Sequence, residues 1–374
     1  MTTTYAAKAP IVTRALLLRC ISIFGAAVGF YLPLSVVPML AAETGSDRSA
    51  GLATVALLLA TVGGEIVTPR LAARIGYRWS LLAGLTLLGA PTLLLAVSAD
   101  PGVILGVSAV RGVGFAICVV AGGALTAQII PAERRGEGLA VVGLVNGTTS
   151  LIALPAGVWA ADRWGYGAVF VVTAVVTLGA LVSVPSLPDH DVTATAADHR
   201  AVLPGLGRPA LIFASVTAAL GVLVTYLPLA AAGQPAWVTA AALFAQPAAA
   251  TCTSWVAGRI GDRVGPVRLL APGLVVAALG MACLSFTPIV GALVFGAGFG
   301  ILQNATLSLM YKRVPTGGEM TVSAVWNIAY DLGMAGGALG AGLVVGAAGY
   351  PATFVLTAVA MVPALVLSVR SASR

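Results

Sequence analysis

Charged side chains are scarce in this sequence. Asp, Glu, Lys and Arg make up 9% of the 374 residues, whereas 59% are hydrophobic. Soluble globular domains carry about 25% charged residues, so water cannot cover most of this chain's surface. A helix that crosses a bilayer needs roughly 20 mostly apolar residues. The sequence therefore predicts an integral membrane protein whose length accommodates about twelve crossings.

The sequence also lacks the alternation of polar and apolar residues that marks a membrane-spanning β-strand. Its apolar runs are long and continuous, as in residues 53–62 and 269–284. An all-α membrane fold is therefore expected. Residues 1–10 are polar, and the apolar run after Arg14 is too long for a signal peptide and has no cleavage site. We expect the first helix to stay in the membrane.

Cysteine and histidine form no pattern that would hold a metal. Cys20, Cys118, Cys252 and Cys283 lie singly within apolar runs, without metal-ligand spacing. The chain has no P-loop, no His-Glu-x-x-His and no Gly-x-Ser-x-Gly motif. We therefore expect no enzyme activity, no cofactor and no metal.

Apolar runs separated by polar or Gly/Pro-rich breaks predict six helices in each half of the chain. They lie near 14–41, 50–69, 80–99, 102–130, 138–160 and 167–187, then near 208–231, 236–257, 269–287, 288–310, 320–344 and 351–370. With this division, sixteen of the 20 basic residues fall on the side of the membrane that holds both termini, and only Arg48 and Arg163 fall on the other. Because basic loops stay in the cytoplasm, a plasma-membrane protein with both termini cytoplasmic is predicted. The net charge of +7 then reports topology and needs no nucleic-acid partner; a monomer is expected.

The two halves resemble each other at matching positions. Four pairs of segments recur in order: Tyr31–Leu34 with Tyr226–Leu229, Arg74–Gly76 with Arg263–Gly265, Gly112–Ile117 with Gly296–Ile301, and Gly165–Phe170 with Gly349–Phe354. Duplicated halves around a central site are common in transporters. The repeat predicts an N-terminal six-helix bundle at 1–187, a cytoplasmic linker at 188–207 and a C-terminal bundle at 208–374. The linker holds both histidines, His190 and His199, for which a solvated segment or a metal or pH-sensing role is open.

One loop motif points to a known family. Gly258-Arg-Ile-Gly-Asp-Arg-Val-Gly265, followed by Arg268, resembles the loop signature of the major facilitator superfamily. The first-half counterpart, residues 69–76, has Ala73 where that family carries an aspartate. The resemblance implies two pseudo-symmetric six-helix bundles and charges that latch a cytoplasmic gate. The gate candidates are Arg70, Arg74, Arg78, Gly258, Asp262 and Arg263, and anchoring by the positive-inside effect is the alternative.

Arg111 and Asp331 are the charged residues nearest the middle of their predicted helices. A charge at this depth costs at least about 2.5 kcal/mol on insertion scales and usually faces a cavity or a partner. Arg111-Gly-Val-Gly114 resembles the family's helix-4 motif, whose arginine is implicated in proton coupling. The alternative is an arginine that bonds to backbone carbonyls and holds helices 1 and 4 together.

Asp331 is the candidate proton carrier, since a carboxyl group in a low-dielectric interior can exchange a proton near neutral pH. It could also attract a cationic substrate, or be a static partner of a neighbouring polar group. Arg19 and Glu65 lie at matching depths in adjacent helices, which predicts a gate or structural ion pair.

Other polar residues inside the predicted helices are candidates for the lining of a substrate cavity. They are Tyr31, Asn146, Tyr226, Gln246, Gln303, Asn304, Trp326, Asn327 and Tyr330. The fifth helix, with Asn146, Pro155 and Gly157, partly resembles the motif of drug and metabolite antiporters, but Leu154 stands where that motif has glycine. The sequence thus favours a transporter that exports a small organic molecule in exchange for protons. An uptake symporter and a non-transporting sensor or assembly subunit are the alternatives.

Overall fold

The computed structural model describes residues 13–130, 135–188, 203–314 and 319–372. These residues form helices α1 (Arg14–Tyr31), α2 (Val36–Thr44), α3 (Asp47–Gly89), α4 (Thr92–Leu95), α5 (Pro101–Ile129), α6 (Arg135–Trp164), α7 (Tyr166–Gly179), α8 (Leu203–Ala230), α9 (Ala236–Val264), α10 (Val267–Cys283), α11 (Pro288–Lys312), α12 (Glu319–Ala360) and α13 (Val362–Ala372), with a short 3₁₀ helix at Ala180–Ser183. Within the described ranges no strand is present. The all-α prediction is confirmed.

Eight helical segments are long and apolar enough to cross a membrane, and α10 is a shorter apolar helix. With 43 and 42 residues, α3 and α12 are about twice as long as one crossing requires. Each is two helices merged across a kink, at Gly76 in α3 and at Gly349 in α12. The predicted first helix is instead interrupted between α1 and α2, at a turn that contains Pro33.

The backbone repeats between the halves. Positive φ angles occur at Gly76 (82°) and Gly265 (89°), and again at Gly165 (82°) and Gly349 (75°). Each pair occupies equivalent positions in the repeat predicted from the sequence. Only glycine adopts such a φ without steric cost, so the matched glycines fix four sharp changes of chain direction. The predicted internal repeat is confirmed at these positions.

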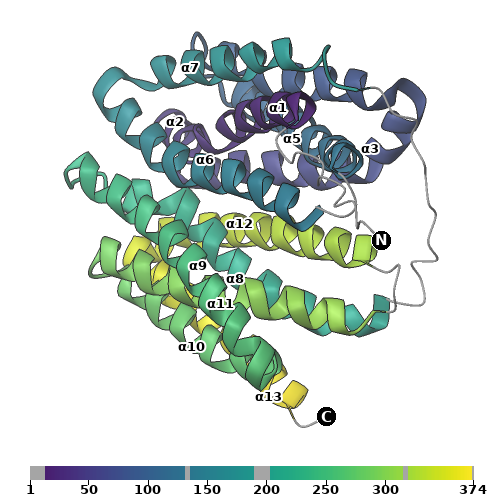
Figure 1. Ribbon diagram of the computed structural model, residues 1–374. Helices are drawn as coiled ribbons and strands as arrows, with labels where there is room; N and C mark the ends of the chain where they lie inside the picture. The colour runs from purple at the N-terminus through teal and green to yellow at the C-terminus, as the bar shows by residue number, and fades with distance from the viewer. Residues whose placement is uncertain (1–12, 131–134, 189–202, 315–318, 373–374) are drawn as a thin grey trace, which may run out of the picture.

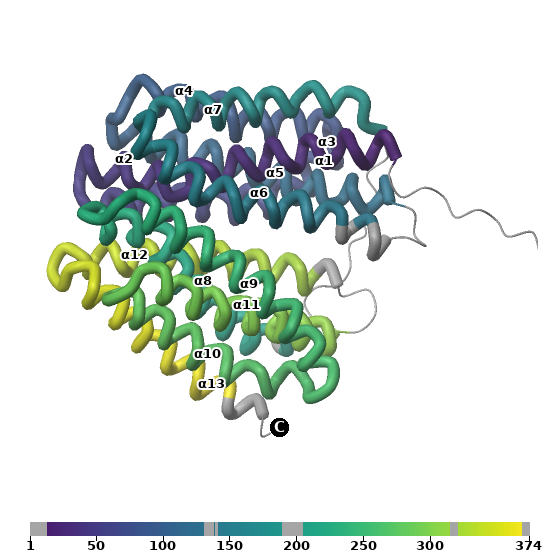
Figure 2. Tube along the Cα trace, turned by 60° about the vertical axis from the view of Figure 1, so that its left-hand side comes forward, coloured from purple at the N-terminus to yellow at the C-terminus, as the bar shows by residue number. Residues whose placement is uncertain are grey.

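The helices form two bundles, one stacked on the other. Figure 1 shows α1 to α7 in the upper bundle and α8 to α13 in the lower one, and Figure 2 shows the same separation after rotation. Helix α3 packs against α12 and α6 against α9, so these pairs join the bundles. The start of α1 and the end of α13 lie at the same end of the molecule, here called the proximal end. The opposite end, with the α2–α3 and α8–α9 connections, is called the distal end.

Most of the predicted linker, residues 189–202 with both histidines, lies outside the described residues. Its last five residues were assigned wrongly, because α8 already begins at Leu203. Leu206 is fully buried against Met310 and Val322. The burial of this leucine explains why the helix extends beyond its apolar core.

At the distal end, three hydrogen bonds between side chains or side chain and carbonyl of described residues join the bundles. Ser35 Oγ donates to the Val224 carbonyl at 2.8 Å, and Thr54 Oγ1 and Thr225 Oγ1 lie 3.0 Å apart. The Tyr350 hydroxyl donates to Asp47 Oδ1 at 2.7 Å. The bundles are therefore held together by polar contacts at the end away from the termini.

Candidate functional site

A group of polar side chains meets between the bundles, around Asp331. Asp331 of α12 is 7% exposed, and the charge of Glu65 in α3 acts on it. The charge of Asp331 acts in turn on Tyr31 of α1 and on the neighbouring Tyr330. The Tyr31 hydroxyl interacts with the side chain of Asn146 in α6. Four helices, three from one bundle and one from the other, thus contribute to this central cluster.

Asp331 has no ion-pair or hydrogen-bond partner among the residues that the structure describes. The charge that acts on it is another carboxylate, Glu65. A buried carboxylate without a counter-charge is costly. The carboxyl group is less costly to bury when it is protonated or when a cation neutralises it. This side chain is therefore suited to bind a proton or a cation.

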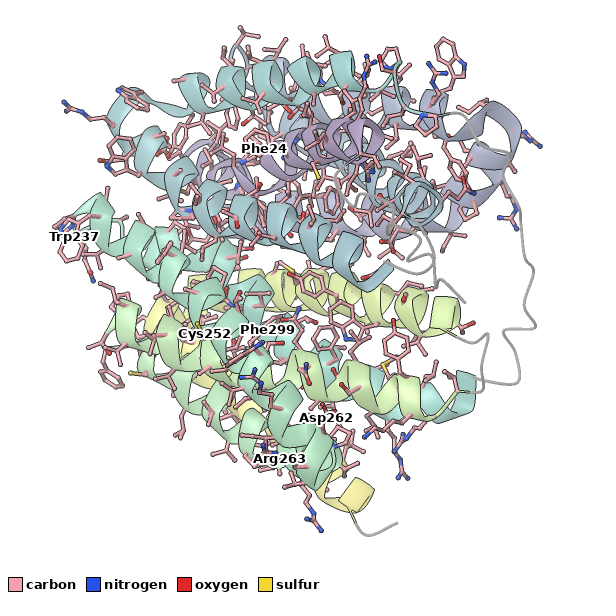
Figure 3. The ribbon with its side chains drawn as sticks, viewed as in Figure 1. Phe24, Trp237, Cys252, Asp262, Arg263 and Phe299 are labelled. Atoms are coloured by element: carbon pink, nitrogen blue, oxygen red, sulfur yellow. The ribbon has the colours of Figure 1, made fainter. Side chains whose placement is uncertain are left out.

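Aromatic rings surround the central cluster on both sides. In the second bundle Phe213 stacks on Trp326 at 4.4 Å between ring centroids, and Tyr330 contacts both rings at 6.1–6.2 Å. Phe299, labelled in Figure 3, completes this group at 6.5 Å from Tyr330. Trp326 and Tyr330 were predicted cavity residues. The two phenylalanines were not, because a phenylalanine within an apolar run carries no signal that separates it from ordinary core.

The first bundle contributes a smaller aromatic group. Phe30 stacks on Phe115 at 3.8 Å and meets the ring of Tyr31 edge-on at 5.2 Å. Tyr31 and Tyr330 also influence each other electrostatically. The two aromatic groups therefore approach each other next to Asp331.

Arg111 is 1% exposed, and its Nη2 donates to the carbonyl of Gly29 at 3.0 Å. Its Nε is buried and finds no partner among the described residues. This geometry matches the predicted alternative in which the arginine bonds to a backbone carbonyl and joins α1 to α5. A role in proton coupling stays a prediction.

The predicted ion pair between Arg19 and Glu65 is wrong. Arg19 is 4% exposed, and its Nε donates to the carbonyl of Gly122 at 3.2 Å and to Thr126 Oγ1 at 2.9 Å. Its Nη1 donates to Ser22 Oγ at 2.7 Å. Arg19 faces α5, whereas the charge of Glu65 acts on Asp331 in the second bundle. Matching depth did not bring the two together, because they lie on different sides of their helices.

Tyr226 does not line the central cluster, contrary to the sequence-based prediction. It is fully buried near the distal end, where its hydroxyl donates to the Ala338 carbonyl at 3.0 Å. A Cβ on Gly51 of α3 would lie 2.4 Å from this hydroxyl. Tyr226 thus fills the contact between the bundles. Its repeat counterpart Tyr31, in contrast, belongs to the central cluster.

The remaining predicted cavity residues lie on the second bundle without a recorded tie to Asp331. Gln246 of α9 is 5% exposed, and Gln303 and Asn304 of α11 are half-buried. Ser308 Oγ donates to Asn304 Oδ1 at 3.5 Å. Asn327, one turn before Asp331, is half-buried. For these four, a role in binding stays a prediction.

The predicted gate residues lie at the proximal ends of α3 and α9. Arg70, Arg74, Asp262 and Arg263 are exposed and Gly258 is half-buried; Figure 3 shows Asp262 and Arg263 on the lower bundle. Arg78 donates to the carbonyl of Pro185, within its own bundle. In the described part of the chain, Asp262 makes no recorded ion pair with an arginine. The bundles are thus not joined by these charges in this conformation.

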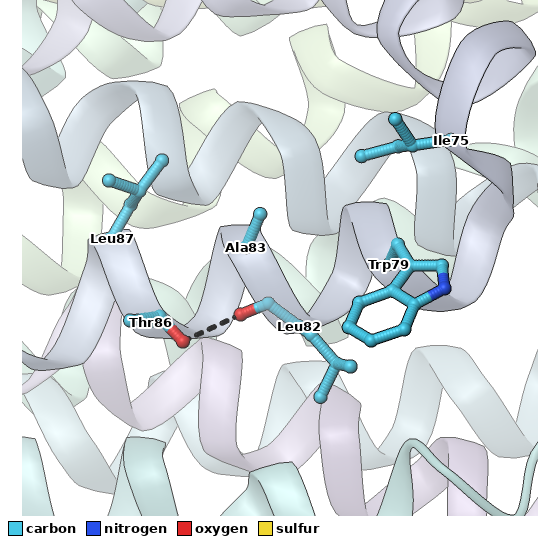
Figure 4. Close-up of a pocket in the computed structure, with 6 residues that line it drawn as sticks. All are labelled: Ile75, Trp79, Leu82, Ala83, Thr86 and Leu87. Carbon is cyan, nitrogen blue, oxygen red and sulfur yellow. Dashed lines mark hydrogen bonds between the residues drawn. The ribbon is translucent and has the colours of Figure 1, made fainter.

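Two surface grooves are apolar and lie away from the central cluster. One follows a single face of α3 and is lined by Ile75, Trp79, Leu82, Ala83, Thr86 and Leu87. The Thr86 hydroxyl donates a hydrogen bond to the carbonyl of Leu82 at 2.8 Å, drawn as a dashed line in Figure 4. The other lies between α1, α6 and α7. Neither groove offers a charged side chain, and we regard both as lipid-facing. No group of three or more His, Cys, Asp or Glu that could hold a metal occurs among the described residues.

The comparison with known proteins identifies the family. A model described as Major Facilitator Superfamily matches residues 19–338, and the chain belongs to this family. Two curated relatives, both uncharacterized MFS-type transporters of Mycobacterium tuberculosis, from strains H37Rv and CDC 1551, are 24% identical over 87% of the chain. The chain spans 44% of the length of these relatives.

Several solved structures share the fold. The nucleoside transporter NupG aligns with 96% of this chain and 99% of its own, at a TM-score of 0.76 and 14% identity. A POT family transporter in complex with 5-aminolevulinic acid covers 96% of each chain at a TM-score of 0.79 and 13% identity. The two-bundle fold predicted from the loop motif and the repeat is therefore confirmed.

Proposed function

We propose that this protein is a secondary active transporter that exports a small organic molecule in exchange for protons. The observation that carries the proposal is the buried carboxyl of Asp331, which has no partner among the described residues and on which the charge of Glu65, in the other bundle, acts. A site at the bundle interface is where rocking of two halves alternates access. A carboxyl that binds either a proton or a cation couples the two, because occupancy by one excludes the other.

In the proposed topology both termini are cytoplasmic, the distal end is external and the second bundle begins with α8 at Leu203. The three hydrogen bonds at the distal end then close the external side, so this conformation is inward-facing. The proximal charges of the α3 and α9 motifs would close the cytoplasmic side in the opposite conformation. Their exposure here fits a gate that is open.

Reconstitution in proteoliposomes with an acidic interior tests the proposal. The panel is one cationic dye (ethidium), one neutral antibiotic (chloramphenicol) and one anionic dye (fluorescein). Antiport would drive a compound inward as protons leave, whereas symport would drive a compound loaded inside outward. The second outcome would favour the alternative, an uptake symporter. Proton-independent behaviour of the whole panel would contradict proton coupling.

Asp331→Asn should abolish gradient-driven movement, because the amide cannot carry a proton. Asp162→Asn is the matched control, since Asp162 is an exposed acid at the far end of α6. Asp162→Asn should transport like the wild type. Full activity of Asp331→Asn would remove this residue as the proton carrier.

A further inference from the structure

We propose that the central cluster binds an organic cation that carries aromatic or other bulky apolar groups. The inference rests on the proposed transport function and names the substrate class of that site. It is carried by the accessible charge, by the unpartnered carboxyl and by the aromatic rings, each of which is an independent observation.

The central cluster holds two acidic side chains, one from each bundle. Asp331 is buried and Glu65 is half-buried, and the charge of Glu65 acts on Asp331. The basic residues that are buried in the described part of the chain are Arg19 and Arg111, at 4% and 1% exposure. Both are held by hydrogen bonds in the layer between α1 and α5. The two acids would therefore repel an anionic ligand, and neither buried arginine is free to offset this. The same two acids would attract a cation.

The lack of partners around Asp331 is typical of a residue that binds a ligand rather than of one that stabilises the fold. It is more than nine-tenths buried, at 7% exposure, and the described residues provide it with no hydrogen-bond or ion-pair partner. Arg19, near the proximal end of α1, has three partners, and Arg111 has one, the Gly29 carbonyl. Buried charges kept for structure bond to their neighbours, and Asp331 makes no such bond among the described residues. A cation in the cluster would supply the missing counter-charge.

The aromatic groups determine what else the cation carries. Tyr330 directly precedes Asp331 in α12, its ring stacks with that of Trp326, and Tyr31 of α1 acts on it electrostatically. All three side chains are half-buried. Aromatic faces attract cations by about 0.5–2 kcal/mol each and also bury apolar surface. Buried Phe213 and Phe299 hold the rings in place from behind. The aromatic rings present apolar faces, so a cation with apolar groups gains by burying them, which a small, strongly hydrated cation cannot do.

Binding to the purified full-length protein in detergent tests the charge preference directly. Tetraphenylphosphonium and tetraphenylborate have nearly the same size and shape and opposite charge, and triphenylphosphine oxide is a neutral relative. Isothermal titration calorimetry should show that the phosphonium binds at least about tenfold more tightly than the borate, a difference of about 1.4 kcal/mol. Equal binding of the two ions, or no binding of the phosphonium, would overturn the inference.

Variants locate the site. Asp331→Asn and Glu65→Gln should each weaken phosphonium binding at least about tenfold and leave the neutral oxide unchanged, whereas Asp162→Asn should change neither. Trp326→Leu should weaken phosphonium binding about threefold or more, and Trp326→Phe should retain most of it. If Asp331→Asn does not elute as a single species, Glu65→Gln carries the test, because its side chain is partly exposed. Wild-type affinity in Glu65→Gln would also overturn the inference.

The inference and the proposed function can fail separately. Phosphonium binding that depends on both acids, without proton-driven transport, would retain the cation site and remove the transport proposal. Proton-driven transport of chloramphenicol or fluorescein by a protein that does not prefer the phosphonium would retain the transport proposal and remove the cation site.

Discussion

The hydroxyl of Tyr350 donates a hydrogen bond to Asp47 Oδ1 at 2.7 Å and so joins α12 to the start of α3, across the two bundles. The repeat counterpart of Tyr350, Tyr166, donates to Glu43, which belongs to its own bundle. Equivalent tyrosines thus make the same kind of contact, but only one of the two crosses the interface. Tyr350 and Asp47 are therefore suited to hold the distal end closed, whereas Tyr166 and Glu43 stabilise one bundle.

Tyr350→Phe should shift the protein toward a state that is open at the distal end. A hydrogen bond to a charged group contributes about 1.5–3 kcal/mol, so an increase of roughly tenfold in the open population is expected. Thr225→Cys, in a background without the four native cysteines, reports this opening, because Thr225 is fully buried under the interface. Its labelling by a membrane-impermeant maleimide should accelerate in Tyr350→Phe. Tyr166→Phe is the matched control and should leave the labelling rate unchanged.

Gly51→Ala should open the same end by a steric route. A Cβ at this position would lie 2.5 Å from the Ala338 carbonyl oxygen, which is backbone and cannot move aside cheaply. We expect faster labelling at Thr225→Cys and weaker proton-driven transport. Gly63→Ala, on the same helix, has open space around its Cβ and should behave like the wild type. An unchanged labelling rate in Gly51→Ala would contradict the close contact of the bundles at this position.

A double-mutant cycle tests the partners of Arg19. Arg19→Leu and Thr126→Val should show a coupling energy of about 1.5–3 kcal/mol in thermal unfolding, the range for a hydrogen bond to a charged group. Arg19→Leu and Glu65→Gln should be additive within about 0.5 kcal/mol, as residues without contact are. A large coupling in the second cycle would restore the ion pair that the sequence predicts.

Gly76→Ala and Gly265→Ala should each lower the melting temperature. Both glycines have φ values above 80°, where a Cβ costs roughly 1–2 kcal/mol. The effects should be of similar size because the positions are equivalent in the repeat. Gly147→Ala, a helical glycine with open space around it, should be neutral or slightly stabilising. A neutral Gly265→Ala would contradict the positive φ.

Several features of the fold could be read directly from the sequence. The scarcity of charge determines that lipid is the solvent, and the continuous apolar runs determine helices of membrane-spanning length. The matched glycines predict turns at Gly76 and Gly265, because positive φ is a local property of one residue. The helix boundaries were less certain where tertiary contact extends a helix, as Leu206 does at the start of α8.

The site depended more on tertiary structure. Depth along a helix follows from counting at 1.5 Å per residue, but each residue also turns the side chain by about 100°. The sequence therefore placed Arg19 and Glu65 at one depth and could not show that they face different neighbours. In the same way, it gave Tyr31 and Tyr226 one role, although one belongs to the central cluster and the other closes the distal end.

The sequence by itself determined the lipid environment, the helices, the internal repeat and the presence of two buried charges. Only the packing of the bundles decided that the charge of Glu65 acts on Asp331, that Arg111 bonds to Gly29 and that Tyr350 reaches Asp47. The reason is physical. Hydropathy and backbone preference act on residues close in the chain, whereas these contacts depend on how helices distant in sequence rotate and cross.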